Sequence, residues 1–130
     1  MNNCLFLNNA AVATAAAAGV DAFGGAISSF SKLTVVDSIF KKNKAIATAS
    51  GSGGGGVISA LFTDVLVLSS VFELNEASND GGAAQLVSTS SVAWYNNKEL
   101  LFGNDALDCD GVSVDGACDS VGENFSIVAP

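Results

Sequence analysis

Hydrophobic residues are concentrated in two similar stretches of the chain, 33–40 and 65–72. Both stretches are rich in Val, Ile and Phe, the residue types that favour β-strands. No stretch keeps apolar residues three and four positions apart for long enough to predict a helix. The pattern therefore predicts an all-β chain built from short strands.

The two hydrophobic stretches belong to a longer internal repeat. Residues 24–45 align with residues 55–77 when one gap is placed before Phe30. Self-similarity of this kind is typical of solenoid proteins, in which each repeat stacks on the next. Ten positions are then identical, namely Gly24/Gly55, Gly25/Gly56, Ile27/Ile58, Ser28/Ser59, Phe30/Phe62, Val35/Val67, Ser38/Ser70, Phe40/Phe72, Asn43/Asn75 and Ala45/Ala77.

The start of the chain matches the tail of this unit. Phe6 takes the place of Phe40, and Asn9 takes the place of Asn43. The sequence is therefore expected to begin inside a repeat.

A third and shorter unit follows the second. It opens at Gly81-Gly82 and closes at 90–96, where Ala93 aligns with Phe72. We interpret it as a degenerate coil that ends the repeat array.

The segment from each Gly pair to the following Phe has nearly constant length, whereas the return segment varies. A segment of fixed length must match its neighbour in space, and a variable one can be a surface loop. We therefore predict that each fixed block of about 22 residues forms one coil of a right-handed parallel β-helix with two or three short strands. The variable segments 12–23 and 47–53 are predicted to be loops.

In-register stacking assigns roles to the repeated residues. Equivalent positions in adjacent parallel strands lie about 4.8 Å apart. Gly pairs are expected at corners that need positive φ or close backbone approach. Asn after a strand is expected to adopt the left-handed region and to bond the same amide one coil away. The prediction is a column of Phe6, Phe40 and Phe72 beside a ladder of Asn9, Asn43 and Asn75.

The same alignment brings opposite charges together. Three of the five lysines fall opposite a carboxylate one coil away. Because like charges directly opposite destabilise paired strands, this complementarity supports the register. The predicted pairs are Lys32 with Asp64, Lys41 with Glu73, and Lys44 with Glu76.

Composition narrows the function classes. The chain has 130 residues, enough for one domain, with five Lys, no Arg, no His and a net charge of −8. Nucleic-acid binding is excluded because it needs cationic groups to displace counterions from phosphates, and His-based catalysis is excluded outright. No apolar run is long enough to predict a membrane-spanning helix. We divide the chain into β-helix repeats at 1–100 and an irregular acidic segment at 101–130.

The acidic segment contains a candidate site for Ca²⁺. Asp108, Asp110 and Asp115 lie around a Gly, but the remaining ligand spacing and the closing Glu of an EF-hand are missing. A solvated acidic loop is the alternative reading. No other cofactor is indicated.

The three cysteines allow two interpretations of their oxidation state. Cys109 and Cys118 bracket a short loop and would pair in an oxidising compartment. The alternative is three free thiols, with Cys4 unpartnered in either case.

Two kinds of tetrapeptide alternate along the repeats. They are GGAI at 24–27, GGVI at 55–58 and GGAA at 81–84, and FLNN at 6–9, FKKN at 40–43 and FELN at 72–75. Their order resembles the repeats of the chlamydial-type polymorphic outer membrane proteins, within the pectin-lyase-like superfamily.

The resemblance implies a surface-exposed or secreted β-helix used in adhesion or as a passenger. Its partners would be host or neighbouring surface proteins, glycans, or further repeats of a longer chain. No secretion signal or translocator domain is seen, so a fragment is expected.

A non-enzymatic adhesion module is therefore the leading hypothesis, and no catalytic residue is assigned. The alternative is a carbohydrate-binding or carbohydrate-active β-helix remnant. Glycoside hydrolysis needs two carboxylates across a cleft, and no acidic cluster follows from the alignment.

Overall fold

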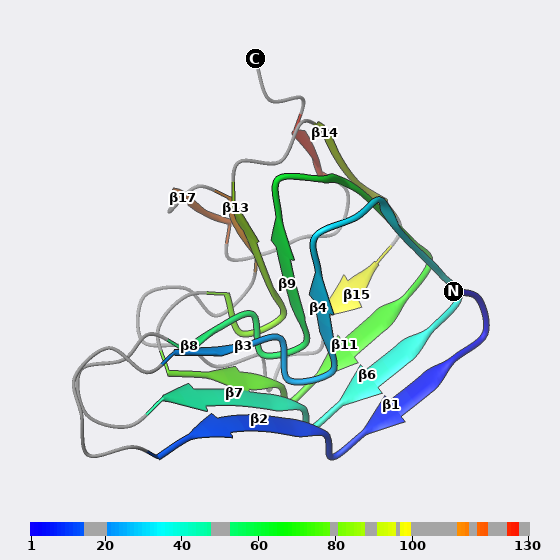
Figure 1. Ribbon diagram of the computed structural model, residues 1–130. Helices are drawn as coiled ribbons and strands as arrows, with labels where there is room; N and C mark the ends of the chain where they lie inside the picture. The colour runs from blue at the N-terminus through cyan, green and yellow to red at the C-terminus, as the bar shows by residue number, and fades with distance from the viewer. Residues whose placement is uncertain are drawn as a thin grey trace.

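A computed structural model of the chain shows a parallel β-helix of about three coils (Figure 1). It describes residues 1–14, 21–47, 53–78, 81–87, 91–95 and 97–99, together with three short strands, β16 (Val112–Val114), β17 (Ala117–Asp119) and β18 (Phe125–Ile127). Every described regular element is a β-strand. The predicted all-β solenoid is confirmed.

Each complete coil contains five short strands. The first coil holds β1 (Leu5–Leu7), β2 (Ala10–Ala13), β3 (Ala22–Phe23), β4 (Ile27–Ser29) and β5 (Leu33–Val36). The second holds β6 (Ile39–Lys41), β7 (Lys44–Ala47), β8 (Gly53–Gly54), β9 (Ile58–Leu61) and β10 (Asp64–Leu68). The third holds β11 (Val71–Glu73), β12 (Glu76–Ala77), β13 (Ala84–Val87) and β14 (Ser91–Tyr95), and is followed by β15 (Lys98–Glu99).

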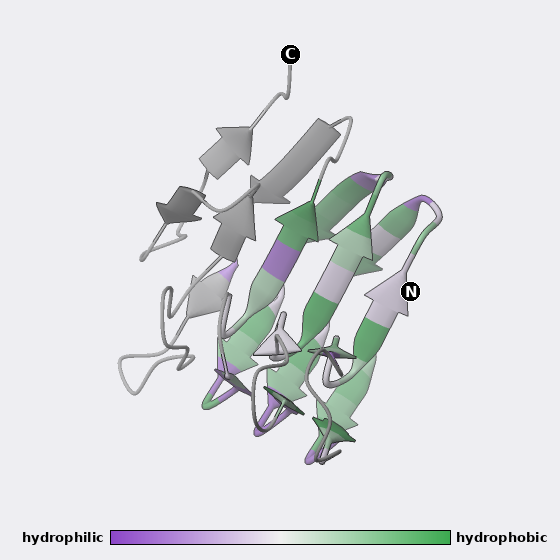
Figure 2. Cartoon of the chain, turned by 60° about the vertical axis from the view of Figure 1, so that its left-hand side comes forward, coloured by the Kyte–Doolittle hydropathy of each residue, from purple (hydrophilic) through white to green (hydrophobic). Residues whose placement is uncertain are grey.

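Equivalent strands of successive coils pair side by side to form five narrow sheets. Hydrophobic residues recur at the same places on neighbouring strands, which Figure 2 shows as aligned green bands. All pairings within the three coils are parallel, as a solenoid requires. The sheet orders are β1-β6-β11-β15, β5-β10-β14-β18, β2-β7-β12, β4-β9-β13-β16-β17 and β3-β8.

The pairing register is the one that the repeat predicts. Ile27 lies opposite Ile58, and Phe40 opposite Phe72. The full coil, however, is 32–34 residues long, as the contacts between successive asparagines show. The predicted coil length of about 22 residues is therefore too short, because the segment of variable length also contributes strands to each coil.

Those strands lie at the ends of the segments predicted to be loops. β2 extends to Ala13, β3 covers Ala22–Phe23, and β8 covers Gly53–Gly54. Small side chains make this possible: Ala13, Ala22, Ala45 and Ala77 are at least nine-tenths buried. A Cβ on Gly53 would meet the Ser78 side chain and the Ala45 carbonyl. The Ala-rich and Gly-rich composition thus lets two backbone layers pack closely.

The main core lies between the β1-β6-β11-β15, β5-β10-β14-β18 and β4-β9-β13-β16-β17 sheets. It is built from aliphatic side chains around two phenyl rings, and Phe6, Ala26 and Ile27 pack against it. Burial of each large side chain contributes roughly 1.5–3 kcal/mol. The buried members are Leu33, Val35, Phe40, Val57, Ile58, Ala60, Val65, Val67, Phe72, Ala83, Ala84 and Leu86.

The two glycines of each pair have different reasons to be Gly. The first of each pair, Gly24, Gly55 and Gly81, has φ between 62° and 65°, a conformation that favours Gly. The second lies against the next coil, since a Cβ on Gly25 would meet the Gly56 carbonyl and one on Gly56 would meet the Gly82 carbonyl. The Gly pair is therefore both a turn and a backbone contact between coils.

The third coil differs from its predicted alignment. Ala93 lies opposite Leu66 in β10, not opposite Phe72. The residue opposite Phe72 is Glu99. The shared sequence SSV misleads the alignment, because Val71 begins β11 whereas Ser91 and Val92 belong to β14, which pairs with the five-residue strand β10.

The segment beyond residue 100 contributes three short strands. β16 (Val112–Val114) continues one sheet in parallel, whereas β17 (Ala117–Asp119) and β18 (Phe125–Ile127) pair antiparallel with β16 and β14. The regular parallel stacking ends in this segment.

Of the described residues other than Gly, seven have positive φ, and all seven are exposed. Asn8, Lys42 and Leu74 occupy one corner of successive coils, directly before Asn9, Asn43 and Asn75. The ladder asparagines were expected in this conformation, but the residue before each of them adopts it. The backbone turns at the residue before each Asn, and this turn directs the Asn side chain into the interior. The other members are Asn3, Asp37, Phe62 and Ser69.

We expect Leu74→Asn to stabilise the protein by about 0.5–1 kcal/mol. A bulky side chain at φ 54° is strained by roughly 1–2 kcal/mol relative to a residue that tolerates this region. The Leu residue is 37% exposed, so its lost burial offsets only part of this gain. Urea denaturation followed by circular dichroism measures the change. Ile39→Asn, at an exposed strand position without positive φ, should destabilise instead; stabilisation by both variants would contradict the argument.

Candidate functional site

The turn between the β1-β6-β11-β15 sheet and the β2-β7-β12 sheet carries the most concentrated polar chemistry of the described residues. We call this turn, residues 8–10, 42–44 and 74–76, the asparagine corner. Its exposed left-handed residue changes from coil to coil, being Asn, Lys and then Leu. The residue that follows is Asn in all three coils. The corner thus combines a constant interior with a variable exterior.

The interior of the asparagine corner is a hydrogen-bonded ladder. Asn9 donates to Asn43 Oδ1 from its backbone N at 3.1 Å and from Nδ2 at 2.9 Å. Asn43 donates to Asn75 Oδ1 in the same way, at 2.9 and 3.0 Å. Asn43 Nδ2 also donates to the Phe6 carbonyl at 3.3 Å, and Asn75 Nδ2 to the Phe40 carbonyl at 3.2 Å. Each amide therefore satisfies backbone groups of a neighbouring coil.

Above the ladder lies a shallow groove of about 310 Å³, the small end of the size range of ligand sites. Residues from all three coils line it, so the groove exists only when the coils stack. Its polar groups are two amides, two ammonium groups and one carboxylate. The lining residues are Asn8, Asn9, Ala10, Lys42, Lys44, Leu74 and Glu76.

Two ion pairs join the coils at or near this corner. Lys44 Nζ lies 2.6 Å from Glu76 Oε2 inside the groove, and Lys41 Nζ lies 2.7 Å from Glu73 Oε1 beside it. These side chains are 24–49% exposed, and such pairs contribute about 0–1 kcal/mol. Among the described residues that line the groove, Lys42 is the cation for which no carboxylate partner is found. The lining residues therefore carry two positive charges and one negative charge although the chain as a whole is acidic.

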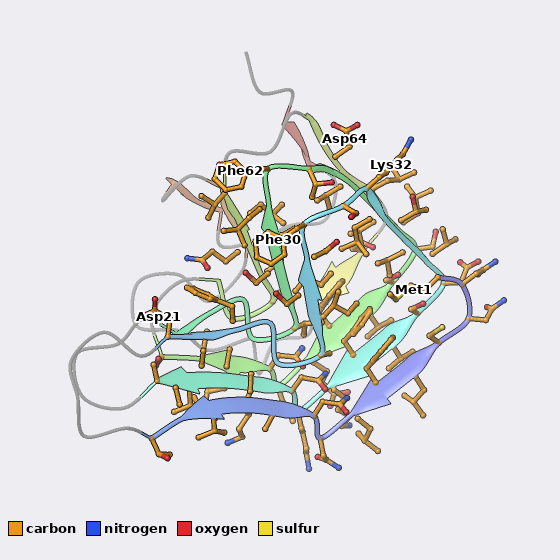
Figure 3. All side chains as sticks on the ribbon, in the orientation of Figure 1. Met1, Asp21, Phe30, Lys32, Phe62 and Asp64 are labelled. Carbon is orange, nitrogen blue, oxygen red and sulfur yellow. The ribbon has the colours of Figure 1, made fainter. Side chains whose placement is uncertain are left out.

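The third predicted charge pair occupies a different corner. Lys32 and Asp64 directly precede Leu33 and Val65, which are partners in the register. Figure 3 shows both charged residues at the same end of their strands. The register thus places Lys32 and Asp64 at neighbouring positions of a second corner, whereas the ion pairs found among the described residues are the other two predicted pairs.

The phenyl rings of Phe6, Phe40 and Phe72 form a single interior file. Their centroids are 4.8 and 5.0 Å apart, with interplanar angles of 9° and 11°. Phe40 and Phe72 have no exposed surface, whereas Phe6 is partly exposed at the end of the file. The column fixes the strands that lead into the asparagine corner.

The other repeated aromatic pair points outward. Phe30 and Phe62 are identical in the repeat, yet they are 70% and 69% exposed. Both lie along one edge of the solenoid, at the ends of β4 and β9 (Figure 3). They are a second outward feature that successive coils repeat.

The sequence argument missed a second polar ladder. Ser38 N donates to Ser70 Oγ at 3.1 Å, and Ser70 N donates to Asn97 Oδ1 at 2.9 Å. Cys4 N donates to Ser38 Oγ at 3.2 Å. The sequence held one signal for this ladder, the identity of Ser38 and Ser70 in the repeat. The structure adds that each follows an exposed residue with positive φ, as the ladder asparagines do.

Several predicted site residues lie outside the described residues. They are Asp108, Asp110 and Asp115 of the Ca²⁺ candidate and Cys109 of the disulfide candidate; Cys118 lies in β17. In the part of the chain that is described, Cys4 is a free thiol and no group of three metal-ligating side chains occurs. The described residues contain no helix long and apolar enough to cross a membrane.

No protein-family model, no curated protein and no solved structure matches this chain. The stacked parallel strands establish a β-solenoid with internal repeats, which is a coarser statement than membership of a family.

Proposed function

We propose that the chain is a non-enzymatic binding module of adhesion type, displayed on a cell surface or secreted, and resembling the repeats of polymorphic outer membrane proteins. The groove at the asparagine corner carries the proposal. Successive coils hold its backbone constant while the exposed residue varies from Asn to Lys to Leu. A rigid scaffold with variable outward residues suits recognition.

The groove favours a polar ligand, such as a glycan or an acidic segment of a host or neighbouring surface protein. Asn8 and Asn9 offer amide donors and acceptors, and Lys42 offers a positive charge. The exposed phenyl groups of Phe30 and Phe62 offer a separate apolar contact surface on another edge of the solenoid. Exposed aromatic side chains are enriched at interaction surfaces.

Carbohydrate binding is the second candidate, and the amide-rich lining favours it. Carbohydrate cleavage has less support. Glu76 is the single carboxylate among the lining residues and is paired with Lys44, whereas hydrolysis needs two carboxylates. The proposal therefore takes the groove as a binding site.

Screening the purified chain on an array of neutral, sulfated and sialylated oligosaccharides, and against extracellular proteins, tests the proposal. We expect binding that Lys42→Ala weakens by about 10-fold, the loss of one charge-assisted contact. Lys32→Ala is the matched control because it makes the same charge change at another corner, and its binding should stay unchanged.

Absence of binding across both panels would contradict the proposal, as would equal losses in the two variants. Release of unsaturated products from polygalacturonate in the presence of Ca²⁺ would replace it with an enzymatic function.

A further inference from the structure

Lys42 stands at the asparagine corner in the second of the three coils that line the groove. Asn8 of the first coil and Leu74 of the third coil take the equivalent place, and all three residues are exposed and have positive φ. Lys42 is exposed with a coil on each side of it, so stacking at this corner does not cover the outward side chain. The order of outward groups along the solenoid is therefore amide, cation and aliphatic group.

The charges that line the groove leave one cation for a ligand. Lys44 Nζ lies 2.6 Å from Glu76 Oε2, so this pair carries no net charge. Lys42 has no carboxylate partner among the described residues. Because the whole chain has a net charge of −8, its surface repels a long polyanion, whereas a ligand with one carboxylate at Lys42 is largely screened from the more distant charges. The groove therefore favours a ligand with a single negative charge.

The backbone donors of the two polar corner residues are already used between coils. The Asn8 N–H donates to the Lys41 carbonyl at 3.0 Å. The Lys42 N–H donates to the Glu73 carbonyl at 3.0 Å. A peptide that binds as an added strand needs open backbone groups at a sheet edge, and these two residues offer no free N–H. The groove therefore recognises a ligand through side chains, which suits a compact ligand that carries its own hydroxyl groups.

The dimensions and the side chains of the groove suit one sugar ring. Its volume is about 310 Å³, and three coils span two spacings of about 4.8 Å each. A pyranose ring carries hydroxyl groups around its rim and C–H groups on its face. The Asn8 amide can donate to and accept from hydroxyl groups, and Leu74, which is 37% exposed, offers an apolar contact to the face of the ring.

We propose that the groove binds one terminal acidic sugar of a glycan, a sugar with a single carboxylate; this proposal rests on the binding function proposed for the groove. The Lys42 ammonium pairs with the carboxylate, the Asn8 amide bonds to hydroxyl groups, and Leu74 packs against the ring. Glu76 disfavours a second negative charge. Charge selects the ligand here, and the amide and aliphatic groups orient it.

Isothermal titration calorimetry of the intact chain with sialyllactose and with its methyl ester tests the proposal, because the two ligands differ in charge and hardly in size. We expect the acid to bind at least about 10-fold more tightly than the ester, the contribution of one hydrogen bond to a charged group. Lys42→Met keeps most of the aliphatic stem and removes the charge, so the two affinities should then agree within about 3-fold. Lys42→Arg should keep the preference.

Lys32→Met is the matched control. It makes the same change at a corner outside the groove, and the preference for the acid should be unchanged. Circular dichroism checks that each variant keeps its β-sheet spectrum.

Two further probes separate this proposal from the general function of the groove. Equal binding of acid and ester, or tighter binding of a heparin oligosaccharide or of polyglutamate than of sialyllactose, overturns the acidic-sugar proposal and leaves the groove as a binding site of another specificity. Binding of none of these probes overturns the proposal too, and so do equal losses in Lys42→Met and Lys32→Met, and both results also contradict the groove function.

Discussion

Phe40→Ala is expected to lower the free energy of unfolding by about 3–5 kcal/mol. Phe40 has no exposed surface and lies between two parallel rings at 4.8 and 5.0 Å. Its removal opens a cavity that the rigid backbone layers on either side cannot close, and it removes both stacking contacts of the column. Equilibrium urea denaturation monitored by circular dichroism at the β-sheet minimum measures the loss.

Phe30→Ala is the control for this prediction. The two residues share a type and a repeat, but Phe30 is 70% exposed, so its truncation should change the free energy of unfolding by less than about 0.5 kcal/mol. Equal effects of the two substitutions would show that the interior column does not stabilise the solenoid. Phe6→Ala should fall between them because its ring is stacked on one side only.

The register of the solenoid could be predicted from the sequence because stacking imposes the same side chain at the same place. Three independent markers, Phe with Phe, Asn with Asn and Lys with Glu, all select one alignment, and a slip of one residue would turn every side chain to the opposite face. The strand pairs Phe40–Phe72 and Glu73–Lys41 follow that alignment. Long-range contacts can be predicted from this sequence because the same pair of residue types recurs between successive coils.

The length of the coil and the positions of the left-handed residues could not be predicted in the same way. Lys42 and Leu74 have no intrinsic preference for positive φ; the stacked coils impose it on them. Ala-rich and Gly-rich segments look like loops, and only packing against another layer makes Ala22 or Gly53 part of a strand. In both cases tertiary context overrides the local preference.

The third coil shows how a degenerate repeat misleads. Ala93 was aligned with Phe72 through the shared SSV, but it pairs with Leu66 instead. With no Phe to extend the column, the pairing is set by the longer strand β10, which offers more backbone hydrogen bonds. Asn97 then follows Ser70 in the second ladder.

The groove at the asparagine corner could not be predicted from the sequence, for a different reason. The repeat identified the constant asparagines but gave no signal for the residue before them, because Asn8, Lys42 and Leu74 differ in type. Their common feature is a backbone conformation, which sequence comparison does not display. A site formed by unlike residues from successive coils becomes visible only after the coils are stacked.

Asn43→Ala is expected to destabilise the protein by about 2–4 kcal/mol. Asn43 has no exposed surface, and its amide makes four hydrogen bonds, to the backbone and side chain of Asn9, to the Phe6 carbonyl and to Asn75 Oδ1. Alanine leaves buried partners in the neighbouring coils unpaired, and each such group costs about 1–3 kcal/mol. The measurement is again urea denaturation, with near-ultraviolet circular dichroism as a second probe.

Asn9→Ala separates the ladder from a general effect of losing an Asn. Asn9 is exposed, and its side chain makes one hydrogen bond, to Asn43 Oδ1, which still accepts from the Asn9 backbone N. We expect a loss of about 1 kcal/mol or less. If the interior and terminal substitutions cost the same, the amides do not stabilise the stack by pairing between coils, and hydrophobic packing alone holds the coils in register.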